Sequence, residues 1–115
     1  MVPSKKDWKL FRDKIATWQE SYMEKLVKEY ILLLNDDLPA SSKFWELEQR
    51  IKQDKKKPGV MLNLNKQQMV FDSISLINDG VITMDDLQEF SDELRDIVNK
   101  LKLTMHFDEI GEKEL

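Results

Sequence analysis

Apolar residues recur at intervals of three and four along most of this chain, which is the pattern of amphipathic helices. The first such stretch starts after Ser4, an N-cap candidate with Asp7 three residues later, and stops at the turn-forming residues 35–39. We expect one long helix that begins with a single apolar face and is almost fully buried toward its end, with room for a break near Trp18. Its apolar stripe consists of Trp8, Phe11, Ile15, Trp18, Tyr22, Leu26, Tyr30 and Leu33.

Two shorter helices are predicted in the middle of the chain. The second helix is expected to begin at a Ser41 or Ser42 cap and to end at Pro58 and Gly59, after a run of lysines. The third helix is expected to begin at an Asn65 cap. Their predicted core residues are Phe44, Leu47 and Ile51 in the second helix and Val70, Ile74 and Ile77 in the third.

Residues 76–87 predict a helix end, a short corner and a new helix start. Gly80 is suited to the left-handed conformation that closes a helix, and Thr83 with Asp86 forms a capping-box pair. The same segment looks like the middle of an EF-hand loop, but Ile77 falls at a ligand position and supplies no oxygen. We therefore expect a helix–corner–helix at Gly80 without calcium.

The fourth predicted helix runs from this corner to residue 103 and has the most regular apolar period. Its core face contains Leu87, Phe90, Leu94, Ile97 and Leu101, and its opposite face carries an acid stripe of Asp85, Glu89, Asp92 and Asp96. Residues 104–115 are expected to form a mobile acidic tail. The pattern thus predicts an all-α fold, a single domain of four main helices over residues 1–103.

Composition agrees with this fold class. The chain has 115 residues, enough for one modest core, and only three glycines and three prolines. Its longest apolar run, residues 30–34, is far shorter than the ~20 residues of a membrane span. Since its N-terminus lacks the apolar stretch of a signal peptide and it contains no cysteine, we expect a cytoplasmic protein without disulfides.

Residues 22–30, 42–60 and 76–87 resemble a family of small uncharacterised helical proteins of Gram-positive bacteria. The resemblance covers residues 18–103 and implies no activity, cofactor or catalytic residue. Some members carry a "multidrug transporter" label, which we reject because a transporter needs apolar spans that this chain lacks.

Residues for catalysis or cofactor binding are scarce. The only histidine, His106, lies in the predicted tail, and the three glycines stand singly rather than in a phosphate-binding loop. With no nucleophile system to assemble from these residues, we expect no enzyme activity, no metal and no cofactor.

The leading hypothesis is therefore a non-enzymatic protein–protein interaction module, a small regulator or inhibitor from a bacterium, phage or mobile element. Trp8, Phe11 and Trp18 are candidate contacts, because aromatic residues favour interfaces, and they predict a homodimer along the first helix if its N-terminal half extends past the rest. The competing interpretation places these aromatics in the core. The acid stripe is a second candidate surface, for a basic partner, against the alternative of an ordinary solvated face.

The alternative function is a nucleic-acid-binding accessory protein that uses a basic cluster in the second helix. The first 57 residues carry thirteen Lys and Arg against ten Asp and Glu, whereas the rest carry five against twelve. Acidic residues interrupt the cluster, and the net charge of the chain is -4. The candidate nucleic-acid contacts are Lys43, Arg50, Lys52, Lys55, Lys56 and Lys57, with Trp45 as a stacking ring.

Overall fold

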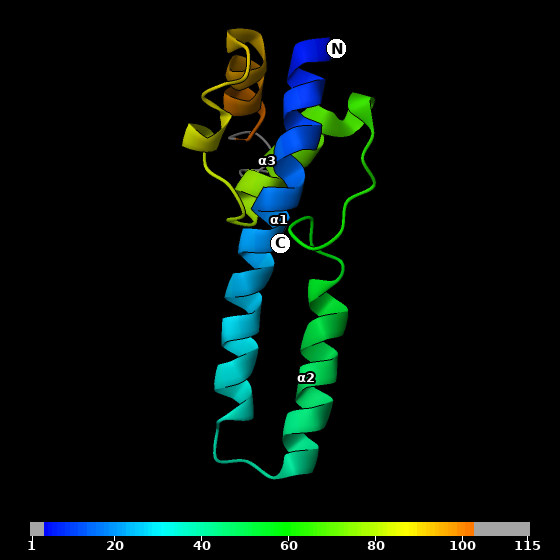
Figure 1. The fold of residues 1–115 in the computed structure, drawn as a ribbon, viewed down its shortest axis with the longest axis vertical. Helices are drawn as coiled ribbons and strands as arrows, with labels where there is room; N and C mark the ends of the chain where they lie inside the picture. Colours follow the sequence, from blue (N-terminus) through cyan, green and yellow to red (C-terminus); the bar gives the residue numbers. More distant parts are fainter. Residues whose placement is uncertain (1–3, 103–115) are drawn as a thin grey trace, which may run out of the picture.

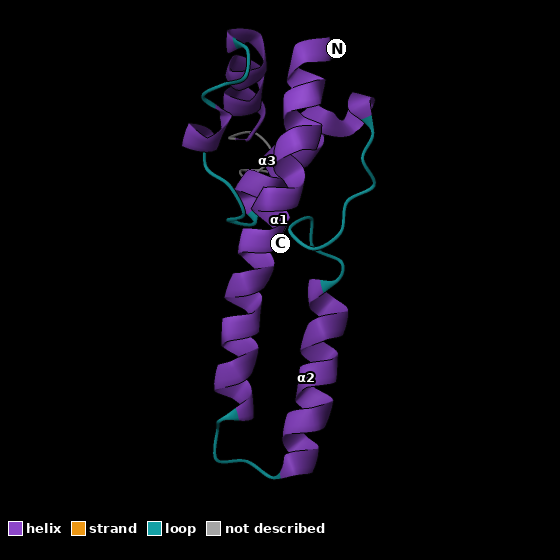
Figure 2. Cartoon of the chain, viewed as in Figure 1, coloured by secondary structure: helices purple, strands orange, loops and turns teal. Residues whose placement is uncertain are grey.

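The computed structural model describes residues 4–102, so the expected tail and His106 lie outside the described residues. The predicted all-α class is confirmed, and the described chain consists of helices and loops (Figure 2). Its helices are α1 (Lys5–Leu34), α2 (Ala40–Asp54), α3 (Met69–Asn78) and a C-terminal helix over residues 92–102, with short 3₁₀ helices η1 (Lys66–Gln68) and η2 (Met84–Leu87).

The molecule has a globular head and a projecting helical hairpin, and α1 belongs to both (Figure 1). The N-terminal half of α1 packs in the head with α3 and the C-terminal helix. The C-terminal half leaves the head and runs antiparallel to α2. The helix is continuous over 30 residues, so no break occurs near Trp18.

The head contains the main hydrophobic core, which is built from residues of α1, α3, η2 and the C-terminal helix. Phe11 is fully buried between Trp8, whose ring stacks at a centroid distance of 6.1 Å, and Trp18, whose ring meets it edge-on at 6.0 Å. The predicted core faces of the third and fourth helices are confirmed at most positions. The buried cluster comprises Phe11, Ile15, Met69, Val70, Ile74, Leu76, Ile82, Leu87, Phe90, Leu94 and Val98.

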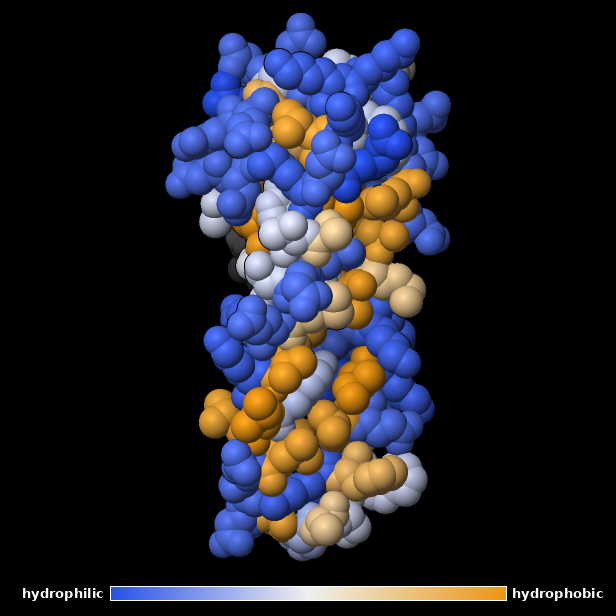
Figure 3. All heavy atoms as spheres, in the orientation of Figure 1, coloured by the Kyte–Doolittle hydropathy of each residue, from blue (hydrophilic) through white to orange (hydrophobic). Residues whose placement is uncertain are grey.

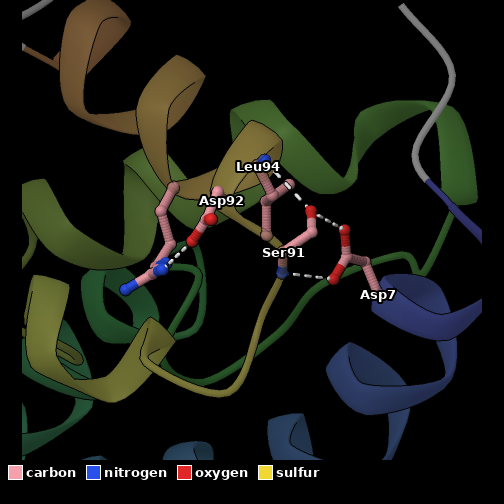
Figure 4. A network of polar contacts seen from close by, with 5 residues as sticks. Asp7, Ser91, Asp92 and Leu94 are labelled. Carbon is pink, nitrogen blue, oxygen red and sulfur yellow. Dashed lines mark hydrogen bonds and ion pairs between the residues drawn. The ribbon is translucent and has the colours of Figure 1, made fainter.

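A polar joint fixes the start of α1 to the start of the C-terminal helix (Figure 4). The buried Asp7 carboxylate accepts hydrogen bonds from the Ser91 backbone N–H at 2.9 Å and from the Ser91 hydroxyl at 2.6 Å. The Ser91 hydroxyl in turn accepts from the Leu94 N–H at 3.2 Å, as an N-cap does. The expected pairing of Ser4 with Asp7 is half present, because the Asp7 N–H donates to Ser4 while the carboxylate is committed to Ser91.

This joint corrects the prediction of one continuous fourth helix. In such a helix the Ser91 N–H would bond to the Leu87 carbonyl, but Asp7 takes that donor instead. The chain therefore forms η2, a turn, and a separate helix capped by Ser91. A carboxylate 84 residues away decides where the helix is interrupted.

Ser91→Ala is expected to lower the free energy of unfolding by about 1–2 kcal/mol, because it removes both the bond to Asp7 and the cap on Leu94. Chemical denaturation measures the change. Ser42→Ala is the matched control, since α2 has no side-chain cap hydrogen bond and this exposed serine should be replaceable at little cost. Equal effects for the two variants would contradict the capping role of Ser91.

The corner at Gly80 has the predicted left-handed conformation, with φ at 76°. The Val81 N–H donates to the Leu76 carbonyl at 2.9 Å and the Gly80 N–H donates to the Ile77 carbonyl at 3.0 Å, which together form a Schellman motif. Beyond it, the Asp86 carboxylate accepts from the Thr83 N–H at 2.7 Å. The capping pair is thus present, but it begins the 3₁₀ helix η2 rather than a long α-helix.

Gly80→Ala is expected to destabilise the protein by about 1 kcal/mol, or roughly 5 °C in Tm. No atom lies within 4 Å of the position that an added Cβ would take, so the cost comes from backbone strain alone. Gly80→Asn tests this origin, because asparagine tolerates the left-handed region and should lose less stability. A thermal melt of Gly80→Ala at or above the wild-type Tm would contradict the strain.

Two predicted helix starts differ in detail. At the start of α2 the N-cap position is Pro39, and neither serine that follows caps the helix. Asn65 does act as a cap, since its side chain accepts from the Gln67 N–H at 2.9 Å, but it begins η1, which continues directly into α3. Pro39 fits its position because its fixed φ leads into a first turn whose N–H groups need no helical partner.

Candidate interaction surface

The hairpin is held at its base by one buried carboxylate. Asp54 of α2 is 4% exposed and accepts a hydrogen bond from the Tyr30 hydroxyl of α1. The Lys57 ammonium lies 3.2 Å from the same carboxylate and Arg50 lies 4.0 Å from it, with its guanidinium 5.5 Å from the centre of the Tyr30 ring. Arg50 also pairs with Glu29 of α1 at 3.5 Å. The two helices are therefore tied together by a polar clamp.

The clamp shifts the ionisation of both of its central groups. Burial by itself raises the pKa of Asp54, but hydrogen bonds from Tyr30 and Lys57 and the positive charges of Lys57 and Arg50 outweigh burial and hold that pKa below 3.8. Burial, followed by the hydrogen bond to Asp54, raises the pKa of Tyr30 to about 12. The clamp thus favours the ionised carboxylate and the neutral phenol at the same time.

The stability contributed by the clamp is expected to depend on pH at both extremes. The stability contributed by ionised Asp54 is fully present above 3.8, the pKa of this group in the unfolded chain. It is lost as the pH falls through the lower pKa of the folded state. The stability contributed by neutral Tyr30 is fully present below pH 10.0, the pKa of this group in the unfolded chain. It is lost as the pH rises toward the folded pKa of about 12. Urea denaturation of wild type and of Asp54→Asn across this range measures both losses, which should be smaller in the variant. Parallel pH profiles would contradict the clamp.

The loop after α2 is fastened to the middle of α1. The Gln19 side-chain amide donates to the Pro58 carbonyl at 2.9 Å. Gly59 is buried against the ring of Tyr22, and a Cβ at this glycine would lie only 2.4 Å from a ring carbon. The bare backbone of Gly59 is therefore what lets the loop approach α1 where the hairpin leaves the head.

Beyond this base the hairpin exposes apolar side chains, contrary to the predicted burial of the end of the first helix. We define the hairpin face as Val27, Ile31 and Leu34 of α1 with Phe44 and Ile51 of α2. Val27 is 51% exposed, Ile31 50% and Phe44 63%. The expectation failed because only one neighbour, α2, covers this half of α1. Figure 3 shows apolar side chains from both hairpin helices gathered on one side of the molecule.

A groove of about 270 Å³ lies between the two helices on this side. Met23 and Val27 line it from α1, Ile51 lines it from α2, and Val60 closes it near the head. Lys55 stands at its edge. The groove is largely apolar, so it is shaped to receive apolar side chains from another molecule rather than a polar ligand.

The aromatic residues predicted to contact a partner are instead part of the head. Phe11 is fully buried, and Trp8 and Trp18 are partly buried against the core. The ring centres of Trp18 and Phe90 are 6.3 Å apart. The predicted dimer along Trp8 and Phe11 required the N-terminal half of α1 to extend past the rest of the molecule, and this condition is not met. The reason is that the N-terminal half of α1 is covered by α3 and the C-terminal helix, and the opposite half projects.

The acid stripe is exposed but divided among three elements. Asp85 lies in η2, Glu89 in the following turn, and Asp92 and Asp96 at the start of the C-terminal helix. Three of these carboxylates have ion pairs: Glu89 with Lys14 at 3.3 Å, Asp92 with Arg95, and Asp96 with Lys100 at 3.1 Å. Exposed pairs of this kind contribute little to stability, and they reduce the net negative charge offered to a basic partner.

The basic cluster is also partly neutralised. Arg50 and Lys57 turn toward Asp54, and Lys52 pairs with Glu48 at 3.1 Å, whereas Lys55 and Lys56 are exposed. Lys43 lies one turn into α2, at the opposite end of the helix from this group. Trp45, 61% exposed, also lies near that end and contacts Phe44 edge-on at 5.0 Å. Trp45 and Lys52 are seven residues apart, which is about 10 Å along the helix.

The clamp was not predicted, although its signal is present in the sequence. Asp54 is the single acid in a stretch that includes Arg50, Lys52 and Lys55–Lys57, and an isolated acid among cations is a candidate for a central partner. The partner Tyr30 could not be identified from spacing, because the pairing depends on how α1 and α2 lie against each other.

Comparisons of the chain with family models, curated proteins and solved structures yield no match. Among residues 4–102, no helix combines the length and apolarity needed to cross a membrane. In the same part of the chain, no group of three or more His, Cys, Asp or Glu side chains is placed to hold a metal ion. The geometry defines the class of molecule: a small all-α protein with a helical head and a projecting hairpin that bears an apolar face.

Proposed function

We propose that this protein is a non-enzymatic protein–protein interaction module that binds its partner through the hairpin face. The observation that carries the proposal is the exposure of large apolar side chains on a pair of helices that is otherwise tightly fastened. Phe44 is 63% exposed and Ile31 50% exposed on the same projecting element. Contiguous apolar surface of this kind on a soluble domain usually marks a binding site.

The clamp and the loop contacts support this proposal. Asp54 and Tyr30 hold the helices together, and Gln19 holds the following loop against α1. A surface that is already ordered loses little conformational entropy when a partner binds. We further propose that the protein is a small regulator or inhibitor from a bacterium, phage or mobile element that acts in the cytoplasm by occupying another protein's surface.

Affinity capture with matched variants tests the proposal. Wild-type protein, Ile31→Glu and Leu32→Glu are immobilised and exposed to a bacterial lysate. Leu32 is 73% exposed on the same helix, but lies about 100° around the axis from Ile31 and off the hairpin face. We expect specific proteins to be captured by wild type and by Leu32→Glu but not by Ile31→Glu. Capture of the same proteins by all three would contradict the proposal.

A second candidate function is supported by a separate feature, the shallow depression beside the end of α2. Lys52, Lys55 and Lys56 line it together with Met61, which is 63% exposed. Lysines around a depression can hold nucleic-acid phosphates. A nuclease-treated lysate separates the two functions, since material lost on nuclease treatment and on Lys55→Glu supports nucleic-acid binding.

A further inference from the structure

We infer that the occupant of the hairpin face is a second copy of this chain, packed antiparallel so that the two hairpins form a four-helix bundle. This inference rests on the proposed function and names its partner. It differs from a dimer through the head aromatics, because Phe11 is fully buried. Three features of the hairpin favour a second copy: the size of its exposed face, the spacing of that face along the helices, and the distribution of charge between its two ends.

The spacing on both helices suits helix-on-helix packing. Val27, Ile31 and Leu34 recur at four and three residues on α1, and Phe44 and Ile51 are one heptad apart on α2. Two antiparallel helices that each expose such a stripe present half of a four-helix bundle. A second hairpin packed on the groove supplies the other half of the bundle. Because the two copies are related by two-fold symmetry, the same side chains form both sides of the interface.

The area of the face fits a reversible dimer. With the exposed fractions of its side chains, the hairpin face presents roughly 400 Å² of apolar surface per copy. A polar rim brings the total for two copies to about 1,000 Å², the lower end for a specific interface. We therefore expect a weak, reversible dimer.

Charge separates the antiparallel arrangement from the parallel one. The hairpin tip carries Asp36 and Asp37, both exposed, in the turn between α1 and α2. The base carries Lys55, which is exposed at the edge of the groove, and Lys52, which is exposed and pairs with Glu48 at 3.1 Å. From Phe44 to Lys55 the helix rises about 17 Å, so a copy laid antiparallel over the whole face places its acidic tip against the basic base of the other. A parallel pair would set acid against acid and lysine against lysine.

The apolar surfaces at the two ends are complementary in the same arrangement. The exposed rings of Phe44 and Trp45 project near the tip, in edge-on contact with each other. At the base, Met61 and Leu62 share the shallow depression with the lysines. Antiparallel packing brings the Phe44 ring of the hairpin face toward Lys55 of the other copy, which borders both the groove and this depression, so the ring can reach Met61 there.

Sedimentation velocity over a range from low micromolar to several hundred micromolar tests self-association. We expect wild type and Leu32→Glu to shift together from monomer to dimer, while Ile31→Glu stays monomeric at every concentration. Circular dichroism establishes that each variant is folded, which is expected because the position is half-exposed. A wild type that is monomeric throughout would overturn the inference.

Charge reversal tests the orientation. Asp36→Lys with Asp37→Lys, and separately Lys52→Glu with Lys55→Glu, should each weaken self-association by about tenfold or more at low salt. In an equimolar mixture of the two reversed proteins, the lysine tip of one meets the glutamate base of the other and the aspartate tip of the second meets the lysine base of the first, so the mixed dimer should recover. The chain that carries all four changes restores opposite charges at both contacts and should recover the wild-type dimer. Failure of the fourfold variant to recover would overturn the antiparallel arrangement.

The capture experiment keeps this inference distinct from the proposed function. A wild-type monomer that captures other proteins through Ile31 would overturn the second copy as occupant and leave the interaction module standing. A wild-type monomer whose capture is unaffected by Ile31→Glu would overturn both. Dimerisation lost in Ile31→Glu, with recovery in the fourfold charge variant, supports the inference whatever else the lysate provides.

Discussion

Phe11→Ala is expected to lower the free energy of unfolding by about 3–5 kcal/mol, the largest effect of any single change considered for this chain. Phe11 is fully buried and sits between Trp8 and Trp18, so removing its ring leaves a cavity and ends two aromatic contacts. The surrounding core cannot collapse readily, because it draws on α1, α3 and the C-terminal helix at once. Chemical denaturation followed by circular dichroism measures the change.

Phe44→Ala is the matched control for this prediction. It removes the same ring from a position that is 63% exposed, so the monomer should lose less than about 0.5 kcal/mol. The comparison is made at low protein concentration, where self-association does not contribute to stability. Similar losses for the two variants would contradict the division of the molecule into a packed head and an exposed hairpin.

Gly59→Ala is expected to destabilise the protein by about 2–3 kcal/mol through overpacking. Ring carbons of Tyr22 lie 2.4–2.8 Å from the position of the added Cβ, well inside van der Waals contact. The clash involves the ring near its attachment to the chain, and Tyr22 is only 9% exposed, so the ring has little room to move. Separation of the loop from α1 should follow, and thermal denaturation measures the loss.

A double-mutant cycle checks the origin of this effect. Tyr22→Ala removes all three ring carbons that meet the new methyl group, including Cγ, so Gly59→Ala should cost much less in that background. The coupling between the two changes is expected to exceed about 1 kcal/mol. Strictly additive losses of stability would show that Gly59→Ala destabilises the protein through the backbone of residue 59 and not through contact with the Tyr22 ring.

Sequence alone determined the features that depend on near neighbours. The three- and four-residue period of apolar side chains established the all-α class and the extent of α1 to Leu34. The left-handed corner followed from Gly80 and its flanking residues, because a Schellman motif is closed by backbone groups within six positions. The pairing of Thr83 with Asp86 was predictable for the same reason, since its two members are three residues apart.

Tertiary structure decided everything that depends on which segments meet. The interruption before residue 92 comes from Asp7, whose carboxylate takes the N–H that a continuous helix would have used. The same limit applies to burial. A stripe of apolar residues indicates that a helix surface is buried against other side chains. It does not indicate whether those side chains belong to the same chain. Phe11 was covered by the head and Ile31 was left half-exposed on the same helix, because the chain provides several neighbours for one half of α1 and a single neighbour for the other.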